Sequence, residues 1–447
     1  MPSPLRQDAL EILPLQSVPN LTIQIPGSKS LTNRALILAA LANGTSTLHG
    51  ALASEDTAVM IESLRRLGFD VIEEDAGETL RIAGRGGNIP VNYAELFLAN
   101  SGTSTRFLTA LCALGRGKYR LDGIDRMRQR PQSDLLDALA DLGVSARSEL
   151  GTGCPPLIVE SAGELPGGTV RVGSEASSQF LTALLMISPF AKSDVTLEIR
   201  GKLRPHYVDI TRRMMAEWGV IARLSSTAQL SETASPSLSY LVASGQRYLA
   251  QTDYQIEPDA SSASYFFAAA AISGGSVTVP GLNCHDSLQG DVKFATEVLI
   301  QMGCSVSDTE SGLRVTGATG GKLKGIEVDM SAISDTSLTL AAIAPFADSP
   351  TTVTGIAHAR LQECDRISAI CAELTRLGVQ VEEFQDGFKI YPTSNFKSAR
   401  IRTYGDHRVA MSFALIGLRV PGVTIEDPAC TGKTFPDFWE RLELLRK

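Results

Sequence analysis

The sequence predicts an α/β protein built from six copies of one unit, and two recurring patterns predict it. In the first, a helix-like stretch ends in an apolar residue and a glycine, and an alternating strand follows. Glycine in that place is typical of a helix C′ cap in the left-handed conformation. The glycines, about 75 to 84 residues apart, are Gly68, Gly143, Gly219, Gly303 and Gly378.

The second pattern is a short strand that ends in a glycine about 18 to 23 residues before each of those caps. The strand-ending glycines are Gly50, Gly123, Gly201, Gly281 and Gly355. A sixth such strand, at 423–427, precedes a final helix expected over 437–445. The chain thus reads as six helix–strand–helix–strand units of about 75 residues. A length of 447 residues favours two domains, hence three units in each.

Two helical stretches, 180–187 and 265–272, are apolar nearly all round. Such helices are expected inside a domain rather than on its surface. The Ser/Thr-rich stretch 225–238 predicts a loop or hairpin tip.

The composition indicates a cytoplasmic globular protein. Hydrophobic residues make up 43% and charged residues 20%, and no run of 18 apolar residues occurs. We read no signal or transit segment in residues 1–21. The net charge of −8 argues against nucleic-acid binding, although an acidic protein can bind anions where its cations converge.

The cysteines and histidines predict neither disulfides nor a metal site. Seven scattered cysteines include no Cys-x-x-Cys pair, and the five histidines lack metal-ligand spacing. We expect reduced thiols and no metal.

The most informative segment is 26–34, which combines Lys29, Arg34, a glycine turn and several hydroxyl side chains ahead of the apolar run 35–42. A helix N-terminus presents free N–H groups and suits phosphate or carboxylate. The alternative is a Ser/Asn-rich turn that only caps the helix. Lys29 and Arg34 exceed what capping requires, so an anion-binding loop is favoured.

Other polar clusters also precede apolar helices. Segment 100–106 contains Gly102 and Arg106, and segment 125–131 holds three arginines. Of these, Arg130 beside Pro131 is best placed to be fixed at a helix start, whereas a solvated charge run is the alternative. Asp335 precedes an apolar helix and is either a functional acid or an ordinary cap.

A P-loop can be set aside. Residues 432–434 read Gly-Lys-Thr, but Asp427 occupies the place of the first glycine and Pro436 interrupts the helix that should follow.

Together these segments resemble the 5-enolpyruvylshikimate-3-phosphate synthases (3-phosphoshikimate 1-carboxyvinyltransferases), from residue 26 to residue 437. The motifs that carry the resemblance lie at 26–34, 100–106, 126–131, 177–185, 259–265 and 406–411. The resemblance implies two similar domains, each of three βαβαββ units in an inside-out α/β barrel, joined by a two-strand hinge. It places one domain at 1–27 plus 257–447 and the other at 28–256.

The resemblance also implies the reaction. The enolpyruvyl group of phosphoenolpyruvate passes to the 5-hydroxyl of shikimate 3-phosphate through a tetrahedral adduct, and phosphate is released. No cofactor is needed. The expected partners are the two substrates, with neither nucleic acid nor membrane, and the expected state is a monomer.

By motif position, the resemblance assigns three groups of site residues. The residues expected to contact the substrates from the first loop are Lys29, Ser30 and Arg34. Those expected to hold phosphoenolpyruvate are Gly102, Arg130, Gln179, Arg366, Arg408 and Lys433. Those expected to hold shikimate 3-phosphate are Ser177, Ser178, Tyr207 and Asp335. Asp335 is the expected base, and Lys29 and Glu363 are the expected proton carriers.

The chemistry requires many cations. Each pair of unit charges at about 5 Å repels by roughly 3 kcal/mol at an effective dielectric constant of about 20, and both substrates carry several charges. We therefore expect both domains to contribute cations to one cleft that closes on the substrates.

The sequence departs from the family pattern at four positions. Gln362 replaces the usual Lys, His358 a common Asn, Arg204 a common Ser, and Phe107 a frequent Pro. We hypothesise that His358 or Arg204 partly replaces the lost charge and contacts the substrate.

Two other functions remain open at this point. The related UDP-N-acetylglucosamine enolpyruvyl transferases carry a reactive cysteine on the loop around 115–131, but no cysteine lies between Cys112 and Cys154. A catalytically silent binding protein is the other alternative, and Gln362 is its support.

Overall fold

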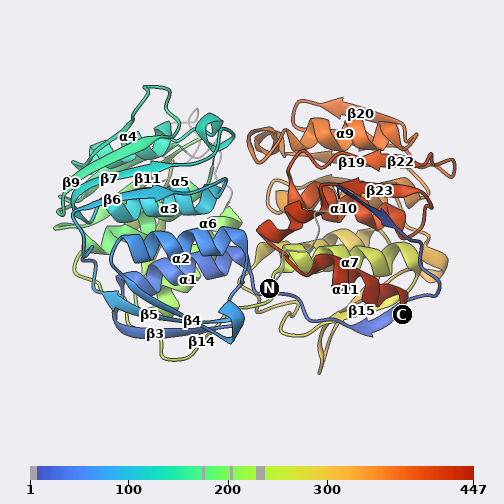
Figure 1. Ribbon diagram of the computed structural model, residues 1–447, viewed down its shortest axis with the longest axis horizontal. Coiled ribbons are helices and arrows are strands. Elements are labelled where there is room, and N and C mark those ends of the chain that lie inside the picture. Colours follow the sequence, from blue (N-terminus) through green and yellow to red (C-terminus); the bar gives the residue numbers. More distant parts are fainter. Residues whose placement is uncertain (1–7, 174–176, 202–204, 228–236) are drawn as a thin grey trace. The chain divides into compact units, whose positions relative to one another are not determined.

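The computed structural model describes residues 8–173, 177–201, 205–227 and 237–447 (Figure 1). The chain divides into two compact units. Unit 1 comprises Met1–Pro26 and Glu257–Lys447, and unit 2 comprises Gly27–Ile256.

The described part of unit 2 contains three four-stranded sheets. In each, the first pair of strands is parallel and the other two pairs are antiparallel. Their orders are β14(Tyr254–Gln255)-β3(Asn43–His49)-β5(Thr79–Arg85)-β4(Asp70–Glu74), β6(Tyr93–Phe97)-β7(Arg116–Asp122)-β9(Leu157–Ala162)-β8(Ser145–Ser148), and β10(Gly168–Gly173)-β11(Val195–Arg200)-β13(Ser237–Val242)-β12(Ala222–Thr227).

Unit 1 repeats this plan. Two sheets have four strands, and in the third β1 pairs antiparallel with β23. Their orders are β16(Ser305–Thr309)-β17(Gly312–Thr316)-β15(Ser276–Val279)-β2(Asn20–Thr22), β18(Glu327–Asp329)-β19(Thr351–Thr354)-β21(Gly387–Ile390)-β20(Val381–Phe384), and β1(Ala9–Ile12)-β23(Val423–Glu426)-β22(Ala399–Ile401). Mixed α/β architecture with six small sheets confirms the predicted fold class.

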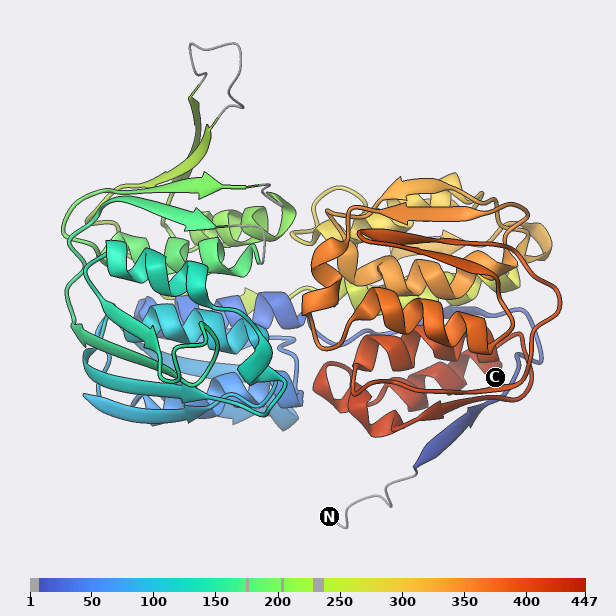
Figure 2. The same cartoon turned by 90° about the horizontal axis from the view of Figure 1, so that it is seen from above.

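Six helices form the buried interiors, three in each unit. They are α1(Lys29–Leu41), α3(Gly102–Cys112) and α5(Gln179–Ile187) in unit 2, and α7(Ala260–Ser273), α8(Ser337–Ile343) and α10(His407–Gly417) in unit 1. Nearly every residue of each is buried, as predicted for 180–187 and 265–272. Within each unit these helices lie between the sheets (Figures 1 and 2).

The remaining helices have one buried and one exposed face, as an outer layer requires. They are α2(Glu55–Arg66), α4(Ser133–Asp141), α6(Pro205–Glu217), α9(Arg366–Arg376) and α11(Phe438–Glu443). Among the described residues, none of the helices has both the length and the apolar character needed to cross a membrane.

The glycine pattern is confirmed. The φ angles at the five predicted caps are 87°, 75°, 88°, 97° and 83°, all in the left-handed region. Each of the five strands β3, β7, β11, β15 and β19 ends within two residues of its predicted glycine. The prediction for 225–238 was too broad, because β12 extends to Thr227 and β13 begins at Ser237; the residues between lie outside the described part.

The chain passes between the units twice, once after β2 and once after β14. β2 pairs in parallel with β15 of unit 1, although the helix that follows β2, α1, belongs to unit 2. β14 pairs in parallel with β3 of unit 2, although the next helix, α7, belongs to unit 1. Each strand therefore pairs within its own unit, and the helix that follows it along the chain lies in the other unit.

Candidate active site

In unit 2, the loop 26–34 leads into α1, with Lys29 and Ser30 as its first two residues. The N-cap residue Ser28 makes no side-chain cap hydrogen bond. Lys29 and Ser30 are half-buried. The capping explanation for this serine is therefore not supported, and the polar residues here are left for another role.

Arg34 is a buried cation held by neutral groups. Its Nε donates to Oγ1 of Thr211 at 2.8 Å, and its two terminal nitrogens donate to the backbone oxygens of Ser30 at 2.8 Å and Tyr207 at 3.1 Å. Burial lowers the pKa of Arg34 to about 10. Its guanidinium also lies 5.4 Å from the ring centroid of Phe107, one of the departures from the family pattern. Among the described residues Arg34 joins no ion pair, so its charge is available to an anion.

The start of α3 brings two arginines close to Gly102. A Cβ at Gly102 would lie 2.5 Å from Nη2 of Arg130 and 2.7 Å from Nη1 of Arg106. Nη1 of Arg130 donates to the backbone oxygen of Asn100 at 3.2 Å. Only glycine leaves both guanidinium groups in place here.

Gln179, the first residue of α5, connects this cluster to a second helix. Its Oε1 accepts from Nη1 of Arg106 at 2.7 Å, and its Nε2 donates to Oγ1 of Thr103 at 3.1 Å. Its backbone N–H donates to Oγ of Ser177 at 3.2 Å, and the neighbouring Ser178 is the buried N-cap residue of α5. Two helix starts, two arginines and hydroxyl groups thus converge within unit 2, which is a favourable setting for an anion.

Arg204 lies outside the described residues. Of the arginines at 128 and 130, Arg130 joins this cluster and Arg128 does not. Arg128 is half-exposed and pairs with Asp122 at 2.8 Å, and Nη1 of Arg126 donates to Oε1 of Gln129 at 3.3 Å. The solvated-run alternative therefore holds for Arg128.

In unit 1, Arg366 is the centre of a network of acids. It is the first residue of α9 and its side chain is 2% exposed. Its Nε lies 2.8 Å from Oδ2 of Asp406, its Nη1 3.1 Å from Oδ1 of Asp335, and its Nη2 3.1 Å from Oε2 of Glu363. Burial lowers the pKa of Arg366, but the three carboxylates outweigh burial and raise it above its ordinary value.

Arg408, the second residue of α10, holds the other oxygen of Asp335. Its Nη2 lies 2.8 Å from Oδ2 of Asp335, and its Nη1 donates to the hydroxyl of Tyr265 at 3.5 Å. The alternative reading of Asp335 as a helix cap is wrong, because the N-cap of α8 is Thr336 and Asp335 binds two arginines instead.

The remaining predicted residues of unit 1 surround this network. Nζ of Lys433 lies 2.8 Å from Oε1 of Glu363. Oε1 of Gln362 accepts a hydrogen bond from Nη1 of Arg366. Nε2 of His358 lies 2.8 Å from Oγ of Ser334, next to Asp335. The structure thus brings together every site residue predicted for unit 1.

Sequence reasoning missed Asp406 and Arg106 as site residues. Asp406 is fully buried, pairs with Arg366 and accepts from the backbone N–H of Arg408 at 2.9 Å. Its place directly before the apolar helix α10 was an available signal. Arg106 was visible in its motif, but its contact with Gln179 depends on the packing of α3 against α5.

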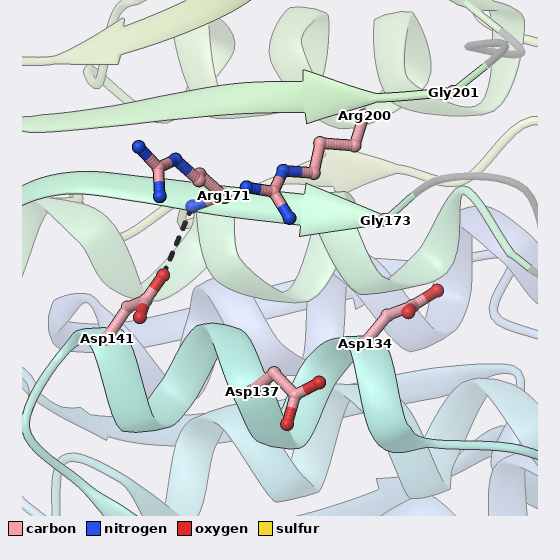
Figure 3. Close-up of a pocket in the computed structure, with 7 residues that line it drawn as sticks. All are labelled: Asp134, Asp137, Asp141, Arg171, Gly173, Arg200 and Gly201. Atoms are coloured by element: carbon pink, nitrogen blue, oxygen red, sulfur yellow. Dashed lines mark hydrogen bonds between the residues drawn. The ribbon is translucent and has the colours of Figure 1, made fainter.

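A separate hollow of about 430 Å³ on unit 2 includes none of the predicted site residues (Figure 3). It lies between α4 and the ends of β10 and β11. Its lining residues are Asp134, Asp137, Asp141, Arg171, Gly173, Arg200 and Gly201. Among the described residues no cluster of three or more His, Cys, Asp or Glu has the arrangement of a metal site.

Comparisons with known proteins decide the family. The sequence profile of EPSP synthase (3-phosphoshikimate 1-carboxyvinyltransferase) matches residues 18–442. The chain belongs to this family. The 3-phosphoshikimate 1-carboxyvinyltransferase of Nostoc punctiforme is 47% identical over 97% of this chain and 98% of its own length. The chloroplastic enzyme of Arabidopsis thaliana is 44% identical over 97% of this chain and 84% of its own length.

A solved structure agrees on the fold. The EPSP synthase from Acinetobacter baumannii has a TM-score of 0.77, with 24% identity and 97% of each chain covered. The family membership makes the chain an enzyme, a carboxyvinyltransferase, and confirms the resemblance found in the sequence.

Proposed function

We propose that this enzyme transfers the enolpyruvyl group of phosphoenolpyruvate to the 5-hydroxyl of shikimate 3-phosphate, releases phosphate, and uses residues of both units for one reaction. The family match supports the reaction. The observation that supports the residue assignment is the position of Asp335 between Arg366 and Arg408.

Asp335 is suited to be the base toward the 5-hydroxyl. Its side chain is 24% exposed, whereas those of Arg366 and Arg408 are 2% and 6% exposed. Each carboxylate oxygen bonds one arginine. The two arginines thus fix the carboxylate in orientation, and it still has an exposed edge from which it can accept the proton of a substrate hydroxyl.

Glu363 and Lys433 form a second acid–base pair at 2.8 Å. We assign Glu363, with Lys29 of unit 2, to carry the proton to and from the methylene carbon. Protonation there makes the neighbouring carbon electrophilic, and attack by the 5-hydroxyl, whose proton passes to Asp335, gives the tetrahedral adduct. Loss of phosphate and of one proton from the methyl group then forms the enol ether. The assignment of each step to Lys29 or Glu363 stays open to test.

The charges of each unit support a contribution from both. In unit 1 the cations Arg366, Arg408 and Lys433 pair with the acids Asp335, Glu363 and Asp406. In unit 2, by contrast, the hydrogen bonds of Arg34 and Arg130 go to neutral groups. We propose that these cations, with Lys29, supply the positive charge that two anionic substrates require.

The substrate assignments follow those made from sequence. We assign Gly102, Arg130, Gln179, Arg366, Arg408 and Lys433 to phosphoenolpyruvate. We assign Ser177, Ser178, Tyr207 and Asp335 to shikimate 3-phosphate. We assign Lys29, Ser30, Arg34, Arg204, His358 and Gln362 to the substrate site without choosing between the two substrates. Cytoplasmic location, a monomeric state and the absence of nucleic-acid partners stay predictions.

A phosphate-release assay with phosphoenolpyruvate tests this function. Release with shikimate 3-phosphate and none with UDP-N-acetylglucosamine supports it; the reverse result, or no release with either, contradicts it. Arg366→Gln is expected to lower kcat/KM by about 10³-fold or more, because it leaves buried acids unpaired. The control Arg400→Gln alters a half-exposed arginine that pairs with Glu426 and is expected to have wild-type activity.

A further inference from the structure

A buried acid that no assigned role uses lies beside the proposed base. Asp291 belongs to the short 3-10 helix η4(Gly290–Val292) and is 8% exposed. Its Oδ2 accepts a hydrogen bond from the hydroxyl of Ser261 at 2.9 Å. Its Oδ1 is buried and meets no hydrogen-bond donor within the described chain, and no cation of those residues lies within 4 Å of the carboxyl.

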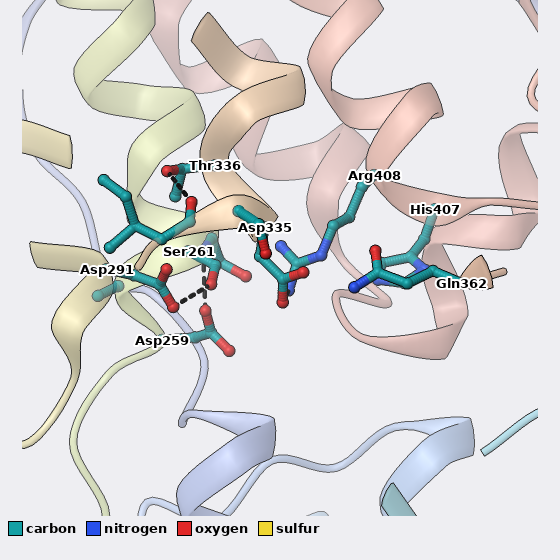
Figure 4. A network of polar contacts seen from close by, with 12 residues as sticks. Asp259, Ser261, Asp291, Asp335, Thr336, Gln362, His407 and Arg408 are labelled. Carbon is teal, nitrogen blue, oxygen red and sulfur yellow. Dashed lines mark hydrogen bonds and ion pairs between the residues drawn. The ribbon is translucent and has the colours of Figure 1, made fainter. Parts of the chain in front are cut away.

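The charged groups that face Asp291 come from three elements. They are Asp259 at the start of α7, Asp335 in η7(Ser334–Thr336), and Arg408 of α10. Figure 4 shows the carboxyl of Asp291 directed toward Ser261, with Asp259 below it and Asp335 and Arg408 beyond. Two acids and one arginine therefore surround a carboxyl that has a single donor.

This geometry disfavours a negative charge on Asp291. Burial raises its pKa, the negative charges of Asp335 and Asp259 raise it further, and Arg408 and the Ser261 hydroxyl oppose them; the pKa lies at about 7. Like charges that share one site seldom all ionise together, and the more exposed and better-paired member keeps its charge. Here that member is Asp335, which has two arginines.

We propose that Asp291 is a positioning residue that acts on Arg408 through its charge, so that its neutral form leaves this arginine to Asp335 and phosphoenolpyruvate, and its ionised form offsets part of the positive charge of the guanidinium. The inference rests on the proposed function. As pH rises through neutrality, the ionised Asp291 adds a negative charge next to the anion site. Binding of phosphoenolpyruvate weakens in consequence, whereas the orientation of shikimate 3-phosphate is less affected.

The test compares the wild type with Asp291→Asn, which is isosteric and permanently neutral. The KM for phosphoenolpyruvate is measured from pH 6 to pH 8.5. The ratio of wild-type to variant KM removes the titration of the substrate itself. This ratio is expected to rise by about fivefold across the range, because ionisation of Asp291 places one additional negative charge near the bound anion. The kcat ratio is expected to change less.

Glu310→Gln, on the exposed turn between β16 and β17, is the matched control and is expected to follow the wild type.

A second measurement does not depend on activity. Potentiometric difference titration of the free proteins is expected to show one proton that the wild type releases with a midpoint near pH 7 and Asp291→Asn does not. Ser261→Ala removes the donor to the ionised form and is expected to move this midpoint upward.

The outcomes separate the two proposals. A midpoint near pH 4, or equal pH dependence of KM in wild type and Asp291→Asn, overturns the inference and leaves the proposed function standing. A wild type that releases no phosphate at any pH overturns the proposed function and the inference together.

Discussion

The carboxylate of Asp335 bridges two arginines from different helices, with Oδ1 3.1 Å from Nη1 of Arg366 and Oδ2 2.8 Å from Nη2 of Arg408. This bridge connects η7 to the first residues of α9 and α10 at the proposed site. The carboxylate therefore has two roles that can be separated by mutation, as a base and as a structural anion.

Asp335→Asn tests that separation. The amide keeps the shape and one acceptor oxygen but cannot take a proton, so kcat is expected to fall by about 10²- to 10⁴-fold. The KM for shikimate 3-phosphate is expected to change by much less than kcat. Steady-state kinetics checks this, with thermal unfolding to verify the fold. A kcat within a factor of about three of wild type would show that another group is the base.

Gly102→Ala is expected to weaken phosphoenolpyruvate binding. The new Cβ would lie 2.5 Å from Nη2 of Arg130 and must displace it. We expect KM for phosphoenolpyruvate to rise about tenfold or more, with a smaller change for shikimate 3-phosphate. Thermal unfolding of the variant checks that the fold is kept. An unchanged KM for phosphoenolpyruvate in a folded variant would contradict the assignment of Gly102.

Gln362→Glu is expected to impair the enzyme even though its shape is unchanged. Gln362 accepts from Arg366, which already binds three acids. A fourth carboxylate would add a negative charge to this network and repel phosphoenolpyruvate. The KM for phosphoenolpyruvate is expected to rise by about tenfold, and the rise is expected to depend little on salt because buried charges are screened less than exposed ones. An unchanged KM would mean that the substrate does not sense this charge.

Asp291→Asn is expected to raise stability at alkaline pH. The folded pKa of about 7 lies above the unfolded value of 3.8, so between these values the folded state binds more protons than the unfolded state. Stability therefore falls as pH rises through that range, and the full penalty is present above pH 7. The variant lacks this penalty, so its free energy of unfolding is expected to exceed that of wild type by about 2 to 4 kcal/mol at pH 8. Urea unfolding at pH 4 and pH 8 checks this; a gap that is the same at both values would contradict the assignment.

Much of the fold could be predicted because the signals are local. A glycine such as Gly378 marks a helix end by backbone sterics alone, and an all-apolar stretch such as 265–272 has no surface on which it could lie. These two rules located the repeat and its buried helices. They say nothing about the partner of each strand, and the grouping of residues 1–27 with 257–447 came from the family resemblance instead.

The residues of the candidate site differ in the same way: some belong to a local sequence motif, and others do not. Lys29, Arg34 and Asp335 stand in motifs dense enough to suggest a function from sequence. Asp291 gives no such signal, because its environment is built by residues from three distant segments. Its role depends on tertiary burial and on the charge of its neighbours, which no local pattern encodes.

The partners of β1 and β2 set the order in which the chain can be completed during synthesis. Unit 2 is one uninterrupted stretch, Gly27–Ile256, and its last strand β14 emerges just before α7. β2 cannot pair then, because its partner β15 follows α7, and β1 must wait longer for β23, close to the C-terminus. Both strands of the nascent chain thus stay unpaired while an entire globular half forms behind them, and they find their partners at different times.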